Sequence, residues 1–175
     1  MIRGTLDIET PTMKHYLNIL IIAAASAALA TASHAAPPKP FDDRDSQEVR
    51  AVFLRQAAAA TAHDIVAFEA VFAPTPAGEP DPVTFVARAY QYWGKPALMD
   101  HFRETFKGVW KFEPDPRNIR IVPMTDDSAE IYAPTQVTFG SSDATAKTGA
   151  FLVHEIAVRT AEGWRIASII PVPAP

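Results

Sequence analysis

The order of the sequence patterns constrains the fold most strongly, because helix-like segments come first and strand-like segments end the chain. From Trp110 onward, β-branched and aromatic residues alternate with polar ones in five segments: 110–113, 119–123, 129–139, 145–159 and 163–172. The breaks between them are rich in Pro, Asp, Gly and Ser, which are typical of turns. Since the last three segments are long and joined by short turns, they predict an antiparallel meander.

Three helices are predicted before this run. Asp45 and Glu48 suggest a capping box at the start of the first helix. Its apolar stripe follows helical spacing and consists of Val49, Val52, Phe53 and Ala60. Asp64 is a natural N-cap for a short second helix, whose stripe is Ile65, Phe68, Val71 and Phe72. Gly94, Lys95 and Pro96 predict the start of a third helix, with Leu98 and Phe102 on its inner side.

Between the second and third helices, residues 73–82 predict a loop and residues 83–92 a single strand. Helices followed by strands indicate an α+β fold. We therefore predict a curved, mostly antiparallel sheet wrapped by three helices from the N-terminal half. A sheet covered on one side tends to leave a cavity between its concave face and the helices, so we expect a cone with a pocket.

The N-terminus has the pattern of a targeting segment. A short polar start at Met13 leads into an apolar run, and Ser33 to Ala35 supply the small residues of a cleavage site. We predict a signal peptide over 1–35 with translation beginning at Met13, a Pro-rich leader over 36–45 and one domain over 46–172. The rival interpretation is an uncleaved anchor, although about fifteen apolar residues are short for a membrane-spanning helix. Cleavage implies a periplasmic or secreted protein with no stable membrane insertion.

Composition excludes several classes of function. The chain has no cysteine, so disulfides, zinc–thiolate sites and thiol nucleophiles are ruled out. A net charge of −4 argues against nucleic acid as a partner. Motifs for phosphate cradles, serine nucleophiles and helical zinc sites are missing from the sequence, which predicts no cofactor.

The chain resembles the SnoaL-like branch of the nuclear transport factor 2-like superfamily. The resemblance spans about 46–170 and rests on three motifs in order: G-x-x-x-hydrophobic-x-x-x-F, A-x-hydrophobic and a closing G-W-x-hydrophobic. The matching residues are Gly94, Leu98, Phe102, Ala129, Ile131, Gly163, Trp164 and Ile166.

This resemblance implies a cone-shaped sheet wrapped by three helices, a pocket open at one end and frequent dimerisation through the outer sheet face. Some members of the family are ketosteroid isomerase-like or polyketide cyclase-like enzymes, whereas others bind ligands or only assemble. Many relatives carry histidines in the closing strand, but residues 164–171 contain none. This difference weakens the expectation of catalysis.

His154 is the candidate base. In a strand over 151–159 it shares one face with Leu152, Ile156 and Val158, and Glu155 lies on the other face. If the face of His154 looks into the cone, the imidazole can act as a base or ligand anchor, and Glu155 points outward. The alternatives are a hydrogen-bonded core histidine or a register in which the other face points inward.

Aromatic residues gather around the start of the third helix: Tyr90, Tyr92, Trp93 and Trp110. Tyr90 and Tyr92 share a strand face with Arg88, and such side chains suit either a ligand pocket or an ordinary core or dimer face. Tyr132 lies on a strand face with Glu130 and fits a pocket rim or an exposed sheet equally well. Trp164 is expected to be structural.

The remaining histidines give weaker signals. His101 fits a surface position at the edge of its helix, and His63 fits a turn residue that bonds the chain locally. Their scatter lacks metal-ligand spacing, so no metal site is predicted. The stretch 42–45 predicts a solvated start to the first helix.

These patterns favour an exported, non-catalytic domain that binds a small apolar molecule, forms a homodimer through its sheet, or does both. The enzyme question stays open. The alternative is an isomerase- or cyclase-like enzyme with His154 as general base and Tyr92 or Tyr132 as the second polar group. A third interpretation, a purely structural assembly module, predicts a cone without a cavity.

Overall fold

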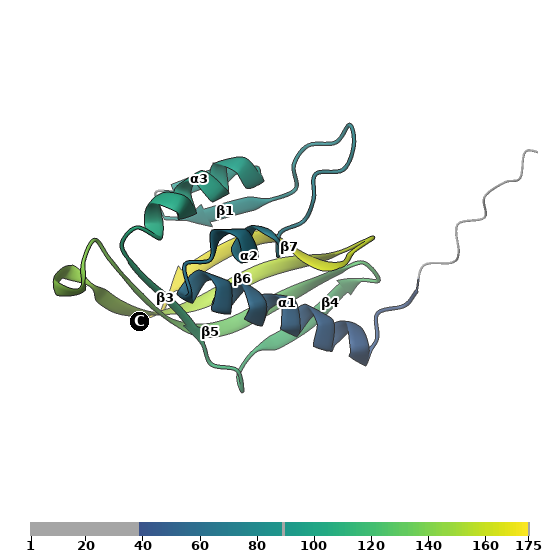
Figure 1. The fold of residues 1–175 in the computed structure, drawn as a ribbon. Coiled ribbons are helices and arrows are strands. Elements are labelled where there is room, and N and C mark those ends of the chain that lie inside the picture. Colours follow the sequence, from purple (N-terminus) through teal and green to yellow (C-terminus); the bar gives the residue numbers. More distant parts are fainter. Residues whose placement is uncertain (1–38, 89, 175) are drawn as a thin grey trace, which may run out of the picture. The chain divides into compact units, whose positions relative to one another are not determined.

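The computed structural model describes residues 39–88 and 90–174. Within these residues the chain forms three α-helices and one seven-stranded sheet, in the predicted order (Figure 1). The predicted signal peptide, its cleavage site and the start at Met13 lie outside the described residues. No helix in the described part is long and apolar enough to cross a membrane.

The helices begin where local capping chemistry allows. Helix α1 (Asp43–Thr61) starts with a capping box, in which Asp42 is the N-cap and Asp45 the third helical residue. The predicted box of Asp45 and Glu48 is therefore wrong by three residues, and the last three residues of the predicted leader are helical. Asp64 caps helix α2 (Ile65–Glu69) as predicted, and Gly94 precedes helix α3 (Lys95–Thr105) with a φ of 87°.

The predicted strand over 83–92 is instead a hairpin of β1 (Thr84–Ala87) and β2 (Tyr90–Trp93). Arg88 adopts a φ of 46° at the turn, a left-handed conformation that is uncommon for a residue other than glycine. The chain therefore reverses after Ala87, and Arg88 is a turn residue that no longer shares a strand face with the tyrosines.

The other strands agree closely with the predictions. They are β3 (Val109–Pro114), β4 (Arg120–Thr125), β5 (Ser128–Gly140), β6 (Lys147–Thr160) and β7 (Gly163–Pro173), with a short 3₁₀ turn η1 (Asp143–Thr145) before β6. Strands β5, β6 and β7 form the predicted antiparallel meander, and β3 and β4 follow each other along one edge of β5. The only parallel pair among the described strands joins β1 to β7.

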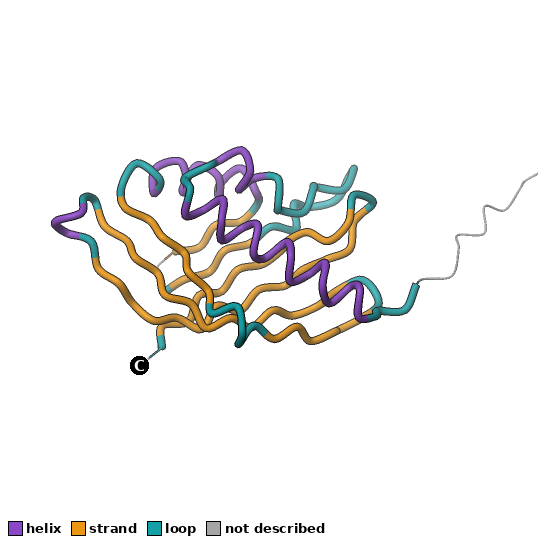
Figure 2. Tube along the Cα trace, turned by 60° about the horizontal axis from the view of Figure 1, so that its bottom comes forward, coloured by secondary structure: helices purple, strands orange, loops and turns teal. Residues whose placement is uncertain are grey.

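The helices lie over one face of this sheet (Figure 2), and the core fills the space between them. Along β5, buried side chains alternate with less buried ones, and the buried set is Ala129, Ile131, Ala133, Thr135 and Val137. Phe53, Phe68 and Leu98 bring the three helices onto this face with at most 2% of their surface exposed. Burial of each such side chain stabilises the fold by about 2 kcal/mol.

Candidate functional site

A cavity of about 850 Å³ lies between the helices and the inner face of the sheet. Its walls come from the three helices, the β1–β2 hairpin, β3, the hairpin of β5 and β6, and the end of β7. Most lining side chains are apolar, including Phe68, Phe85, Phe102, Phe112 and Phe151. Its size lies within the range of about 300–1,000 Å³ that is usual for small-molecule sites.

Glu104 and Glu155 are the acids among the lining residues; Glu104 is exposed, whereas Glu155 is completely buried, and the part of the cavity beside Glu155 is called its inner end here. Strand β6 pairs Glu155 with Ile131 and Ile169, so its side chain lies on the inner face. His154 would face the cone only in a register that turns Glu155 outward. The observed register is the opposite one, with Glu155 inside and His154 outside. Both faces of this strand carry apolar residues, so alternation alone could not show which one the helices cover.

The carboxyl group of Glu155 has an unusual environment. Neither of its oxygens has a hydrogen-bond partner among the described residues. Burial raises the pKa of Glu155 to about 8, and the adjacent Gln56 amide acts in the opposite direction. The group is therefore mostly protonated at neutral pH and titrates close to it.

Gln56 reaches the same part of the cavity from α1, with 3% of its surface exposed. Its Oε1 atom also lacks a partner in the described part of the chain. The sequence indicates this inward position, because Gln56 continues the apolar stripe of Val49, Val52 and Phe53 at helical spacing. A polar residue at a stripe position of that kind faces the interior.

Two of the predicted aromatic residues line the cavity, and two do not. Tyr90 and Trp110 are among its walls, and the buried indole Nε1 of Trp110 has no acceptor among the described residues. Tyr92 packs beside the cavity against Phe85 and His101, and Trp93 is 65% exposed.

His101 lines the cavity rather than occupying a simple surface position. Its ring stacks on that of Tyr92 at a centroid distance of 4.5 Å and also on that of Tyr90 at 5.9 Å. Burial lowers the pKa of His101, which favours the neutral imidazole. The backbone N–H of His63 donates to the Ala60 carbonyl in its own turn, as predicted, and its side chain also bonds the distant Trp110 carbonyl at 3.0 Å.

His154 and Tyr132 lie together on the outer face of the sheet, away from the cavity. They are cross-strand partners with ring centroids 4.8 Å apart. Both contact Glu130: the Tyr132 hydroxyl donates to Oε2 at 2.8 Å, and Nε2 of His154 lies 3.5 Å from Oε1. This position separates both residues from the cavity. No cluster of metal-ligating side chains occurs in the described residues.

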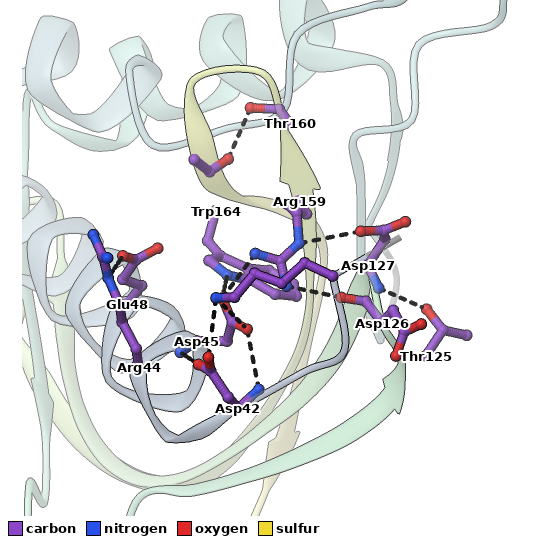
Figure 3. Close-up of polar contacts among 12 residues, drawn as sticks. Asp42, Arg44, Asp45, Glu48, Thr125, Asp126, Asp127, Arg159, Thr160 and Trp164 are labelled. Carbon is purple, nitrogen blue, oxygen red and sulfur yellow. Dashed lines mark hydrogen bonds and ion pairs between the residues drawn. The ribbon is translucent and has the colours of Figure 1, made fainter. Parts of the chain in front are cut away.

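A second buried acid lies where α1 begins (Figure 3). Asp45 is 1% exposed, and its Oδ1 accepts hydrogen bonds from Arg159 at 2.7 Å and from the Trp164 indole at 3.2 Å. Asp127 and the Asp126 carbonyl hold the other side of the Arg159 guanidinium. The predicted solvated start is therefore wrong for Asp45, because these long-range partners compensate for its burial.

The comparisons with known proteins agree with this architecture. Residues 49–170 match the SnoaL-like domain family. No curated protein matches the chain. Similar solved structures include a proposed dehydratase of the NTF2-like family from Streptomyces avermitilis, with a TM-score of 0.62 at 13% identity over 77% of this chain and 99% of that one.

Two further structures show the same fold. A ketosteroid isomerase-like protein from Erwinia carotovora atroseptica has a TM-score of 0.60 at 17% identity, over 77% of this chain and all of that one (100%). A protein with a cystatin-like fold from Nostoc punctiforme has a TM-score of 0.61 at 14% identity, over 78% of this chain and 96% of that one. The chain belongs to the SnoaL-like domain family.

Proposed function

We propose that this protein is an exported binding domain that holds a small, largely apolar molecule in the cavity, with Glu155 and Gln56 as its polar anchor. The observation that carries the proposal is a cavity of about 850 Å³ with an apolar wall and a buried, unpartnered carboxyl group at its inner end. Pockets of this composition bind ligands by apolar burial and use a few polar groups to orient them.

Native mass spectrometry of the protein purified from its own host tests this proposal. We expect a retained small molecule that is lost when the cavity is obstructed by Ala87→Trp, a change in its wall. The matched control is Ala161→Trp, in the exposed turn between β6 and β7. A protein that carries no adduct and binds no naphthalene-sized probe in titrations would contradict the proposal.

The N-terminal sequence supports export, and this part of the proposal has its own test. Expression of the full chain in its host, followed by N-terminal sequencing of the mature protein, should give a chain that begins near Ala36. Recovery of the uncleaved chain in the membrane fraction would favour the anchor instead.

We also propose that the protein dimerises through the outer sheet face. Neighbouring strands place Pro134, Leu152 and Val172 in one row and Tyr132, His154 and Ile170 in the next. Leu152 and Val172 are 41% and 47% exposed, so this face presents apolar surface of the kind that protein interfaces cover. We expect a dimer mass in sedimentation experiments and a monomer for Leu152→Asp; a wild-type monomer would contradict dimerisation.

A proton-transfer enzyme is the second candidate, because the pKa of Glu155 near 8 suits a general base in an apolar cavity. The Glu155 carboxylate would take a proton from the carbon beside a carbonyl and return one to the resulting enolate. Exchange of the α-hydrogens of 2-tetralone in heavy water, followed by NMR, tests this candidate. Wild-type protein should accelerate exchange and Glu155→Gln should not, whereas equal rates would exclude Glu155 as the base.

A further inference from the structure

The cavity gathers most of the unpartnered polar atoms of the domain. Five buried side-chain polar atoms have no hydrogen-bond partner in the part of the chain that the structure describes. Four of them belong to Gln56, Trp110 and Glu155, which all line this cavity; the fifth is Nε2 of His154 on the outer face. Native proteins leave few such atoms, so a concentration in one cavity points to a ligand that bonds them.

The types of these atoms restrict the chemistry of that ligand. Gln56 Oε1 is an acceptor, and both Glu155 oxygens are acceptors once the carboxyl is ionised. Gln56 adjoins Glu155 and its amide favours the ionised carboxylate, so the acceptors of both residues lie in the same part of the cavity. An ammonium group offers up to three N–H donors from a single atom, and hydrogen bonds between it and a carboxylate are among the stronger ones.

The aromatic part of the cavity wall also suits a cation. Aromatic rings of Phe68, Phe102 and Phe112 line the cavity, and ring faces attract ammonium groups. The other lining groups that titrate or carry charge do not place a positive charge beside Glu155. Arg88 is exposed, Lys107 is exposed with Nζ 2.7 Å from Glu104, and burial favours the neutral form of His101.

We propose that the cavity binds a lipophilic amine, with its ammonium group on Glu155 and Gln56, its apolar body among the phenylalanines and an acceptor atom facing Trp110. This inference rests on the proposed binding function and adds the chemical class of the ligand. It differs from a neutral carbonyl or hydroxyl ligand, which would accept a hydrogen bond from protonated Glu155.

The two ligand classes have opposite pH dependences. An ammonium ion needs the ionised carboxylate. At pH values below the pKa of Glu155, the affinity for the ammonium ion should therefore increase roughly tenfold for each unit by which the pH is raised. A carbonyl or alcohol that accepts from the protonated acid should bind equally well up to about pH 7 and more weakly above about pH 8.

Calorimetric titration with 2-naphthylmethylamine and 2-naphthylmethanol separates these classes, because the probes share one apolar body. Between about pH 6 and about pH 7 we expect the amine to gain roughly tenfold in affinity and the alcohol to change little. Glu155→Gln should weaken amine binding at least tenfold at about pH 8 and leave the alcohol within roughly threefold. Glu79→Gln, an exposed loop change of the same kind, should affect neither probe.

Each other result has a defined meaning. If only the alcohol binds, or if the amine binds equally to wild type and Glu155→Gln, the amine inference is overturned and the binding function stands. If neither probe binds to a folded wild type, the proposed binding function fails together with the inference. Circular dichroism of each variant confirms that it is folded.

Discussion

Two acids are buried among the described residues, and they differ in whether other side chains bond them. Asp45 has charged and polar partners on several sides, whereas the Glu155 oxygens have none among the described residues. The hydrogen bond from Arg159 holds the pKa of Asp45 far below its usual range, and burial raises the pKa of Glu155 to about 8. Similar burial therefore gives a structural ion pair at Asp45 and an acid without such a pair at Glu155.

The partners explain why the two sites differ in role. Asp45 connects the start of α1 to β6 through Arg159 and to β7 through Trp164, and these residues lie more than a hundred positions apart in sequence. Glu155 lies in the middle of β6 and lines the cavity. The comparison teaches that the partners of Asp45 compensate for its burial, whereas Glu155 lies beside a cavity without such partners and is the polar anchor that we propose for a ligand.

Among the changes that test this comparison, Asp45→Asn should have the largest effect on the unfolding free energy. It removes the charge that faces Arg159, and loss of one partner from a buried pair costs about 4 kcal/mol of unfolding free energy. Urea unfolding measures this change. Asp127→Asn is the matched control, since Asp127 contacts the same guanidinium at 3.1 Å but is 64% exposed, and it should cost less than about 1 kcal/mol. Equal losses from both variants would contradict a special role for burial of Asp45.

The pH dependence of stability should show the second largest effect. Because the pKa of Glu155 is about 8 in the folded state and about 4.5 in the unfolded state, folded protein holds a proton that unfolded protein loses within this window. The unfolding free energy should therefore fall as pH rises from about 5 to about 8, by about 3 kcal/mol in wild type relative to Glu155→Gln. Thermal or urea unfolding across this range tests the sign.

Asp45 should act in a different pH window. Its folded-state pKa is depressed, so its contribution is fully present above the unfolded-state pKa of about 3.8 and is lost as pH falls through the folded value. The difference between wild type and Asp45→Asn should therefore stay constant from about pH 5 to about pH 8. A difference that shrinks in that neutral window would contradict this assignment.

Two indole groups provide the smallest of these effects. Trp164 donates to Asp45 at 3.2 Å, so Trp164→Phe should cost about 1 kcal/mol more than its packing loss. Trp110→Phe removes a donor that has no acceptor among the described residues, and it should cost no hydrogen-bond energy. Denaturant midpoints of both variants measure this difference in stability. A larger loss of stability for Trp110→Phe than for Trp164→Phe would contradict the prediction.

The fold was predictable because its signals are local. Segments 129–139 and 163–172 lie within two residues of β5 and β7, since alternation and turn residues define strands directly. The hairpin at Arg88 was missed because a non-glycine residue takes a positive φ there, and nothing nearby in sequence indicates such a turn. The start of α1 was misplaced because its aspartates offered two overlapping capping boxes.

The site was less predictable because it depends on which face of a strand the helices cover. His154 and Glu155 are neighbours, and only the packed structure shows that Glu155 faces the cavity. A usable signal existed in Gln56, which continues an apolar helical stripe, and in an acid within an apolar strand. The partners of Asp45 could not be inferred, because Arg159 and Trp164 reach it only through the closed fold.

A direct titration of Glu155 tests the central claim that this acid is buried and uncompensated beside the cavity. Carbon NMR of side-chain-labelled glutamate, with the Glu155→Gln spectrum to assign the signal, follows its ionisation in the folded protein. We predict a midpoint of about 8, which should fall when 2-naphthylmethylamine is added. A midpoint near the ordinary value of 4.5 would contradict the account, because it would show a solvated or paired carboxylate.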